Sequence, residues 1–318
     1  MSLVISKENS SQGGYFLPHH AVIKGDSLTT KTRVVFDGSA KTTSGISLND
    51  ALMVGPTIQQ DLFSIVIRFR TFQFVFTADI KQMYRQISVS PEDACFQKIV
   101  WRNDPKEEIQ TYKLNTVTFG TACALFLASR TLHQLANDEQ ESHPIASSIL
   151  KEDFFVDDCL SGSNDIQEAL YMRNDLINLL KKGNFVLRKW SSNCPKLLEG
   201  FPSEVSNSHL CLDPTETVKT LGLHWNPVTD SFGYSIKLTN SKLRCSKCFI
   251  LSETAKLFDP LGILEPITVT AKLIIQQLWK AKLFWDDPVP ELLTCINKLI
   301  AFDRNTFEEQ PSSEKVVD

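Results

Sequence analysis

The sequence has 318 residues, of which 42% are hydrophobic and 22% are charged, with 13 glycines and 14 prolines. These proportions exclude collagen-like, coiled-coil and wholly disordered chains, and the length suits two or three subdomains. The formal net charge of -4 at pH 7 provides no global positive field, so nucleic-acid binding would have to depend on local placement of charge.

Targeting and redox features are weak along the whole sequence. No apolar run approaches the roughly 18 residues of a membrane span, and the polar start lacks the apolar core of a signal peptide. We therefore expect a cytoplasmic protein that is neither secreted nor embedded in a membrane. The 8 cysteines are scattered, which favours reduced thiols, and Cys245 and Cys248 have no second pair at a zinc-finger spacing.

The N-terminal part of the chain predicts short strands and one helix. Residues 1–14 are polar and are expected to be disordered. Apolar runs at 21–23 and 33–36 predict two strands joined by a polar loop. Apolar residues at three- and four-residue steps then predict a helix over 57–69, with Thr57 as its cap.

The hydrophobic period then changes to two, which is typical of a strand. Residues 72–79 alternate, so the strand buries an aromatic face and carries Asp79 at its end on the other face. A strand pair is predicted at 96–101 and 111–118, followed by a long helix over 120–137.

The second half of the chain begins with a predicted hairpin over residues 153–160, whose turn lies near Asp157 and Asp158. A helix follows from the capping residue Asn164 to the terminating Gly183. Later elements are expected as two strands and then two helices, at residues 185–187, 220–225, 252–258 and 267–279. The change from strand to helix spacing predicts a boundary near 235–245.

Three acids form the candidate site. If the strand of Asp79 and the hairpin of Asp157 and Asp158 are neighbours in one sheet, the carboxylates converge. Burial and mutual repulsion would raise their proton affinity, whereas divalent cations between them would keep them charged. Such a site suits two Mg²⁺ ions about 3.5–4 Å apart, which activate an attacking hydroxyl and stabilise a leaving oxygen. The alternative is a solvated turn, as expected for Asp286-Asp287 in the same chain.

Several motifs resemble those of one enzyme class. Phe155-Val-Asp-Asp158 resembles the acidic box of reverse transcriptases, and Thr77-Ala-Asp-Ile-Lys-Gln-Met-Tyr84 resembles their first catalytic strand. Further motifs follow in the family's order: Pro18-His-His-Ala-Val-Ile-Lys24, Arg33-Val-Val-Phe-Asp37, Phe119-Gly120, Leu187-Arg-Lys-Trp190, Leu221-Gly-Leu-His-Trp225, Leu257-Phe-Asp-Pro-Leu-Gly262 and Trp285-Asp-Asp-Pro288. From about Tyr15 to Pro290 the chain is similar to the polymerase region of BEL/Pao-type LTR retrotransposons.

The resemblance implies an α+β fold of the right-hand polymerase type, in which an antiparallel palm sheet is backed by helices. The palm sheet would come from strands near 72–79, 152–160 and 185–190. The implied divisions are a disordered N-terminus (1–14), fingers (15–71 and 91–118), palm (72–90 and 119–235) and a thumb or connection-like helical region (236–318).

The resemblance also implies an activity, RNA-directed DNA polymerase. Asp79, Asp157 and Asp158 would hold two Mg²⁺ or Mn²⁺ ions, and a primer 3′-hydroxyl would attack a dNTP, a phosphoryl transfer that depends on positioning and charge neutralisation. Its partners would be an RNA or DNA template with its primer, dNTPs and other segments of a longer polyprotein, in the cytoplasm or within virus-like particles.

Further roles follow from the same resemblance, each with a plainer alternative. Arg33 and Lys24 or Lys31 would contact the triphosphate, or be solvated loop charges. Tyr84 would exclude a 2′-hydroxyl, or be a core aromatic residue. Phe119 and Gly120 would approach the nascent base pair, or form an ordinary turn from strand to helix. Lys189 would donate a proton to pyrophosphate or contact a phosphate. Gly222 and Trp225 would support the primer end, with Trp225 alternatively in the core.

The sequence also departs from the family pattern. Leu125 stands where proline is expected, which bears on the path into the following helix and on the activity of this copy. No RNase H or integrase segment is recognisable after the palm, and the aspartic-protease motif is absent, so a peptidase is disfavoured and a polyprotein fragment is expected. Two further classes of protein stay open: a silent remnant that at most binds nucleic acid, and a different palm-fold enzyme such as a nucleotidyl cyclase.

Overall fold

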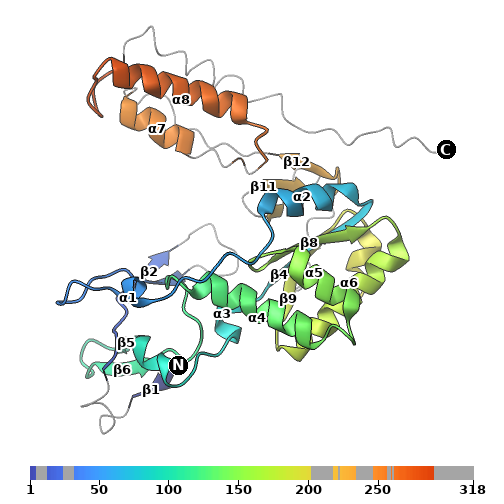
Figure 1. Cartoon of the computed structure of the whole chain (residues 1–318), viewed down its shortest axis with the longest axis horizontal. Coiled ribbons are helices and arrows are strands. Elements are labelled where there is room, and N and C mark those ends of the chain that lie inside the picture. Colours follow the sequence, from blue (N-terminus) through green and yellow to red (C-terminus); the bar gives the residue numbers. More distant parts are fainter. Residues whose placement is uncertain are drawn as a thin grey trace. The chain divides into compact units, whose positions relative to one another are not determined.

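The computed structural model describes residues 1–4, 13–23, 32–201, 218–220, 223–233, 246–255, 259 and 261–289 (Figure 1). The chain divides into two compact units, one made of Met1–Asp61 and Thr77–Lys189, the other of Leu62–Phe76 and Trp190–Asp318. Helices and antiparallel strand pairs occur together, so the predicted α+β class is confirmed. The boundary expected near 235–245 lies outside the described residues.

A four-stranded sheet with the order β7-β8-β4-β9 positions the candidate site. Its strands are β7 (Phe154–Phe155), β8 (Asp158–Ser163), β4 (Phe74–Ile80) and β9 (Leu187–Ser192). β4 and β9 each cross from one unit of the chain to the other. The three segments predicted for the palm sheet therefore do form one sheet.

β4 is buried on both faces rather than on one. Every residue from Val75 to Ile80 is buried, although the alternating sequence predicted one covered aromatic face. A strand in the interior of a sheet, between β8 and β9, loses solvent on both sides when both faces are covered. Asp79 is consequently a buried acid, with a residue exposure of 7%.

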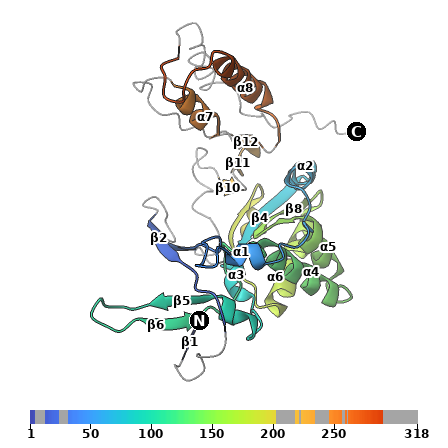
Figure 2. The ribbon, with the colours of Figure 1, turned by 60° about the vertical axis from the view of Figure 1, so that its left-hand side comes forward.

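Three helices back the sheet in the first unit (Figures 1 and 2). They are α4 (Ala124–Asp138), α5 (Pro144–Glu152) and α6 (Ile166–Lys182), with α5 against β7 and α6 against β8. The helix predicted after the hairpin is confirmed as α6, whose Ala169, Leu176 and Leu180 are fully buried. Its N-cap is Asp165 rather than Asn164, because the Asp165 carboxylate accepts the Glu168 N–H. α5 was not predicted from the sequence.

Two smaller sheets complete the first unit. β2 (His19–Ile23) and β3 (Thr32–Phe36) pair antiparallel, as predicted. β5 (Lys98–Trp101) and β6 (Gln110–Lys113) also pair antiparallel but are shorter than predicted, because a 3₁₀ turn, η1 (Asp93–Phe96), precedes β5. β1 (Ser2–Leu3) pairs with β6 (Figure 2), so the expectation of a disordered start is wrong for these two residues.

The helix predicted from Thr57 begins later in the structure. α2 (Leu62–Thr71) starts five residues further on, and residues 57–61 are not helical. Thr57 is therefore not its cap. The Gln59 side chain is instead bonded to the backbone of Val156, a tertiary contact that the local apolar period does not contain.

The second unit contains two groups of described elements. α2 packs on β11 (Leu223–Asn226) and β12 (Ser231–Gly233), which form a sheet with β10 (Val218–Thr220). α7 (Lys247–Ala255) and α8 (Glu265–Lys280) pack together (Figure 1); α7 begins five residues before the predicted helix, whereas α8 agrees closely with its prediction. None of the helices described is long and apolar enough to cross a membrane.

Candidate active site

The three candidate acids lie together at one end of the four-stranded sheet. Asp79 is the penultimate residue of β4, and the N–H of the next residue, Ile80, donates to the Asp157 carbonyl at 2.8 Å. Phe155 and Asp158 face each other across the hairpin, so Val156 and Asp157 form its turn. The expectation that the two strands are neighbours in one sheet is met.

The acidic turn has a strained backbone. Val156 adopts φ = 59°, a left-handed conformation that a β-branched residue rarely takes and that costs on the order of 1–3 kcal/mol. The Val156 N–H donates to Gln59 Oε1 at 3.2 Å, and the Ile80 bond holds the next residue. Gln59 thus belongs to the site, and it was not predicted from the sequence because it lies 97 residues away.

Two cations of β9 neutralise Asp79. Arg188 Nε donates to Asp79 Oδ1 at 2.7 Å, and Lys189 Nζ donates to Asp79 Oδ2 at 2.5 Å. Lys189 was predicted as a site residue, whereas Arg188 was not. The Asp79 side chain is 10% exposed, so the two pairs compensate a carboxylate that water scarcely reaches.

The hairpin acids are less well compensated. Burial raises the pKa of Asp158 to about 7, the charges of Asp157 and Asp79 add to the rise, and Lys189 opposes it. Burial also raises the pKa of Asp157, and the charge of Asp79 raises it further. The backbone hydrogen bond of Asp157 and the two cations of β9 lower this pKa. The three carboxylates therefore interact electrostatically, and a cation placed between them would favour their charged forms.

The donor chemistry of this site fits a hard divalent cation. Carboxylate oxygens are the ligands that Mg²⁺ prefers, and the cationic groups at Asp79 show that positive charge is accepted there. Within the described part of the chain, however, no three His, Cys, Asp or Glu side chains are grouped so as to hold a metal ion. Both Asp79 oxygens are bonded to β9, so Asp79 could serve as a ligand only after releasing a cation.

Tyr84 lies within reach of the acids. It belongs to α3 (Met83–Gln86), the short helix after β4, and is partly buried. Burial raises the pKa of the Tyr84 phenol, and the charge of Asp157 raises it further. The structure therefore brings Tyr84 together with Asp79, Asp157, Asp158 and Lys189 in the first unit.

A second group of predicted residues meets at the end of β3. The rings of Phe36 and Phe119 lie 5.3 Å apart. Gly120 has φ = 94°, and a Cβ there would lie 2.3 Å from the Phe36 carbonyl oxygen, so only glycine fits. Arg33 is on the same strand as Phe36 and is exposed.

Asn49 of α1 (Leu48–Ala51) fixes this turn and was not predicted from the sequence. Its Nδ2 donates to the Gly120 carbonyl at 3.2 Å, and its Oδ1 accepts the Ala122 N–H at 2.8 Å. An asparagine in a short polar helix has no local pattern that predicts contacts more than 70 residues away.

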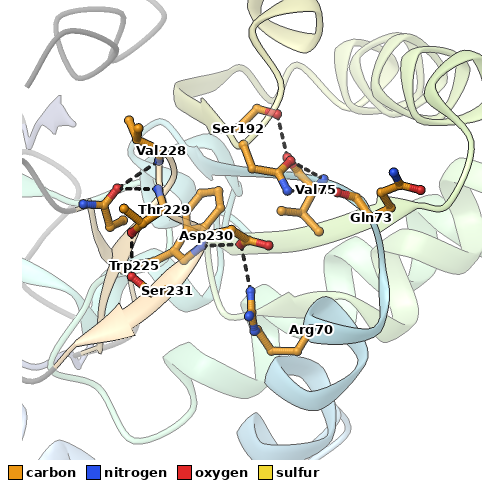
Figure 3. Close-up of polar contacts among 11 residues, drawn as sticks. Arg70, Gln73, Val75, Ser192, Trp225, Val228, Thr229, Asp230 and Ser231 are labelled. Atoms are coloured by element: carbon orange, nitrogen blue, oxygen red, sulfur yellow. Dashed lines mark hydrogen bonds and ion pairs between the residues drawn. The ribbon is translucent and has the colours of Figure 1, made fainter. Parts of the chain in front are cut away.

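Four predicted residues stand apart from these groups. Lys24 and Gly222 lie outside the described residues, as does Lys31. Trp225 is fully buried: its ring lies 5.2 Å from that of Phe69, and its indole N–H donates to Asp230 Oδ1 at 3.0 Å (Figure 3). The Trp225 side chain therefore lies in the core, as the alternative expected. Support of a primer end by its hairpin stays a prediction.

Comparison with known proteins gives one family match by sequence. Residues 246–309 match the family described as the Pao retrotransposon-like RNaseH-like domain. This stretch includes α7 and α8, for which a thumb or connection-like region was predicted and no RNase H segment was recognised. No curated protein matches the chain.

One match among solved structures is the foamy viral protease-reverse transcriptase in complex with an RNA/DNA hybrid. The TM-score is 0.57 at 12% sequence identity, over 91% of this chain and 34% of the viral protein. The chain thus spans about a third of that protein's length. At this identity the likeness concerns the fold, which is a mixed α+β fold similar to that of a retroviral Pol enzyme. The family match concerns a retrotransposon-like domain over residues 246–309, and the structural match concerns the fold.

Proposed function

We propose that this chain is an RNA-directed DNA polymerase region of a retroelement polyprotein, which transfers a nucleotide from a dNTP to a primer 3′-hydroxyl. The observation that carries the proposal is the meeting of Asp79 with Asp157 and Asp158 on neighbouring strands of one sheet. The likeness of the fold to a viral protease-reverse transcriptase supports it. In this proposal the four-stranded sheet is the palm of a fingers, palm and thumb arrangement.

The proposed roles of the residues follow from their placement. Asp79, Asp157 and Asp158 would hold two Mg²⁺ or Mn²⁺ ions, which supply activation of the attacking hydroxyl and neutralisation of phosphate charge. Tyr84, beside Asp157, packs under the sugar and excludes a 2′-hydroxyl. Gly120 lets the backbone approach the nascent base pair, and the exposed Arg33 binds the triphosphate.

Primer extension tests this proposal. The protein should extend oligo(dT) on poly(rA) with dTTP and Mg²⁺ or Mn²⁺, and Asp157→Asn should lower the rate by at least about a hundredfold, since it removes a charged ligand. Asp286→Asn is the matched control, because Asp286 belongs to the other Asp-Asp pair of the chain and is exposed. Extension that is equal in the wild type and Asp157→Asn, or absent from both, contradicts the proposal.

The family match favours one second candidate, an RNase H-like activity of residues 246–309. Hydrolysis of RNA in an RNA/DNA hybrid depends on carboxylate-bound metal ions. Residues 246–255, 259 and 261–289 contain acids, but no three of them are grouped to hold a metal. A hybrid-cleavage assay separates the two activities: cleavage unaffected by Asp157→Asn would assign a nuclease activity to another part of the chain.

A further inference from the structure

Arg188 and Lys189 are consecutive residues of one strand, yet both side chains end on Asp79. Successive side chains of a regular strand point to opposite faces of the sheet. Lys189 departs from that rule because its φ is 54°, which turns the backbone locally into the left-handed region. A non-glycine residue rarely adopts this conformation, so tertiary interactions must stabilise it.

The two ends of these ion pairs differ in their access to water. The Asp79 side chain is 10% exposed, whereas those of Arg188 and Lys189 are 30% and 45% exposed. Water therefore reaches the two cations more readily than the Asp79 carboxylate. The Lys189 ammonium can move into solvent, so an exchange of partners would take place at the cation.

The pairs occupy both carboxylate oxygens of the acid. Asp79 Oδ1 is bonded to Arg188 and Oδ2 to Lys189. Asp157 and Asp158 lie nearby, because the residue after Asp79 is bonded to the Asp157 carbonyl and Asp158 begins the neighbouring strand. A divalent cation drawn to the hairpin acids would therefore compete with Lys189 for Asp79.

On the basis of the proposed function, we propose that Arg188 and Lys189 are internal counter-ions of Asp79, and that a divalent cation binds to the three acids by displacing Lys189. Both are positioning residues, since they act through Asp79. The displaced ammonium is then free to contact an anionic phosphate. The Lys189 ammonium is thus released when the divalent cation binds. Asp79 has a positively charged partner both before and after this binding.

Titration of the full chain with Mn²⁺, followed by the electron paramagnetic resonance signal of free Mn²⁺, tests the exchange without any measurement of polymerase activity. Lys189→Met removes the competitor and should tighten Mn²⁺ binding by about fivefold to tenfold. Lys81→Met is the matched control: Lys81 is exposed, and it lies two residues from Asp79 in sequence. It removes the same charge but no bond to Asp79, so its affinity should stay within about twofold of the wild type.

A second substitution guards against loss of fold in the methionine variant. Lys189→Gly also removes the cation, and glycine adopts φ = 54° without strain, so this variant should keep the strand and bind Mn²⁺ as tightly as Lys189→Met. Circular dichroism of each variant reports whether the fold is intact.

Three results can be distinguished. Tighter binding in both Lys189 variants than in Lys81→Met, lost when Asp157→Asn is added, supports the exchange. Equal changes at Lys189 and Lys81, or weaker binding at Lys189, overturn it while leaving the acid site and the proposed function in place. Absence of Asp157-dependent binding in the wild type, in Lys189→Met and in the Arg188→Met/Lys189→Met double variant overturns both proposals.

Discussion

Asp158 is partly buried beside two further carboxylates, and this environment makes the stability of the metal-free protein depend on pH. Its pKa is about 7 in the folded chain but close to 3.8 when unfolded, so the folded state binds more protons between these values. The contribution of this carboxyl to stability is therefore full below about pH 4 and is lost as the pH rises through 7.

Asp158→Asn should remove this loss. We expect a free energy of unfolding similar to that of the wild type at pH 4 and higher at pH 8, by on the order of 1–3 kcal/mol. The measurement is urea unfolding in EDTA between pH 4 and 8.5. Asp286→Asn, at an exposed acid, should follow the wild type at every pH. A stability difference for Asp158→Asn that does not grow with pH would contradict the assignment.

Sequence patterns predicted the acids but not their partners. Asp79 ends an alternating strand, and Asp157 and Asp158 lie in a hairpin turn, so residue type and spacing were sufficient for them. Arg188 was not predicted as a site residue. Successive strand residues ordinarily face opposite sides, and both Arg188 and Lys189 reach Asp79 because Lys189 has a positive φ, which no local pattern indicates.

At the scale of elements, Asn49 links α1 to the turn before α4. Asn49→Ala removes the bonds to Gly120 and Ala122, with an expected loss of about 1–2 kcal/mol and a fall of several degrees in Tm. Differential scanning calorimetry measures this fall. Asn174→Ala is the control, because Asn174 bonds only to its neighbour Arg173 among the interactions described, and its Tm should change little. Equal Tm values for the two variants would mean that the Asn49 bonds contribute nothing to stability.

Leu125, which stands where proline was expected, lies at the start of α4. Leu125 is the second residue of the helix, and the first turn of a helix leaves its backbone N–H groups without intrahelical acceptors. Proline and leucine are both compatible with this position, so the expected change in the helix path does not follow from the missing proline.

Element boundaries were predicted less well than element types. The hairpin of the acids, α6 and α8 were recognised from period, capping and turn residues. The start of α2 was wrong because Gln59, in the segment before it, bonds to the hairpin, and α5 was missed because nine residues give too short a period. Tertiary contacts decided these cases.

At the scale of the whole molecule, the order of the motifs carried more information than composition. The net charge of -4 gave no indication of a nucleic-acid enzyme. The fold nevertheless resembles that of a viral protease-reverse transcriptase over 91% of the chain at 12% identity. At this identity the likeness is one of fold, which composition does not record.

The C-terminal stretch shows where motif order was insufficient. Residues 246–309 match an RNase H-like family, although no acidic cluster marked them as such in the sequence. Their described part has an apolar helix pair, in which Lys247 lies 4.2 Å from the Trp279 ring centroid and 4.9 Å from that of Trp285. Packing of this kind indicates a structured region but not its chemistry.

The central claim is that acids from two separate strands act as one cation-binding centre. Anomalous diffraction from crystals of the full chain grown with Mn²⁺ tests it most directly. We expect a Mn²⁺ peak coordinated by both Asp79 and Asp157, with the Lys189 ammonium withdrawn from Asp79. Mn²⁺ bound only elsewhere, with Asp79 still paired to Arg188 and Lys189, would contradict the claim.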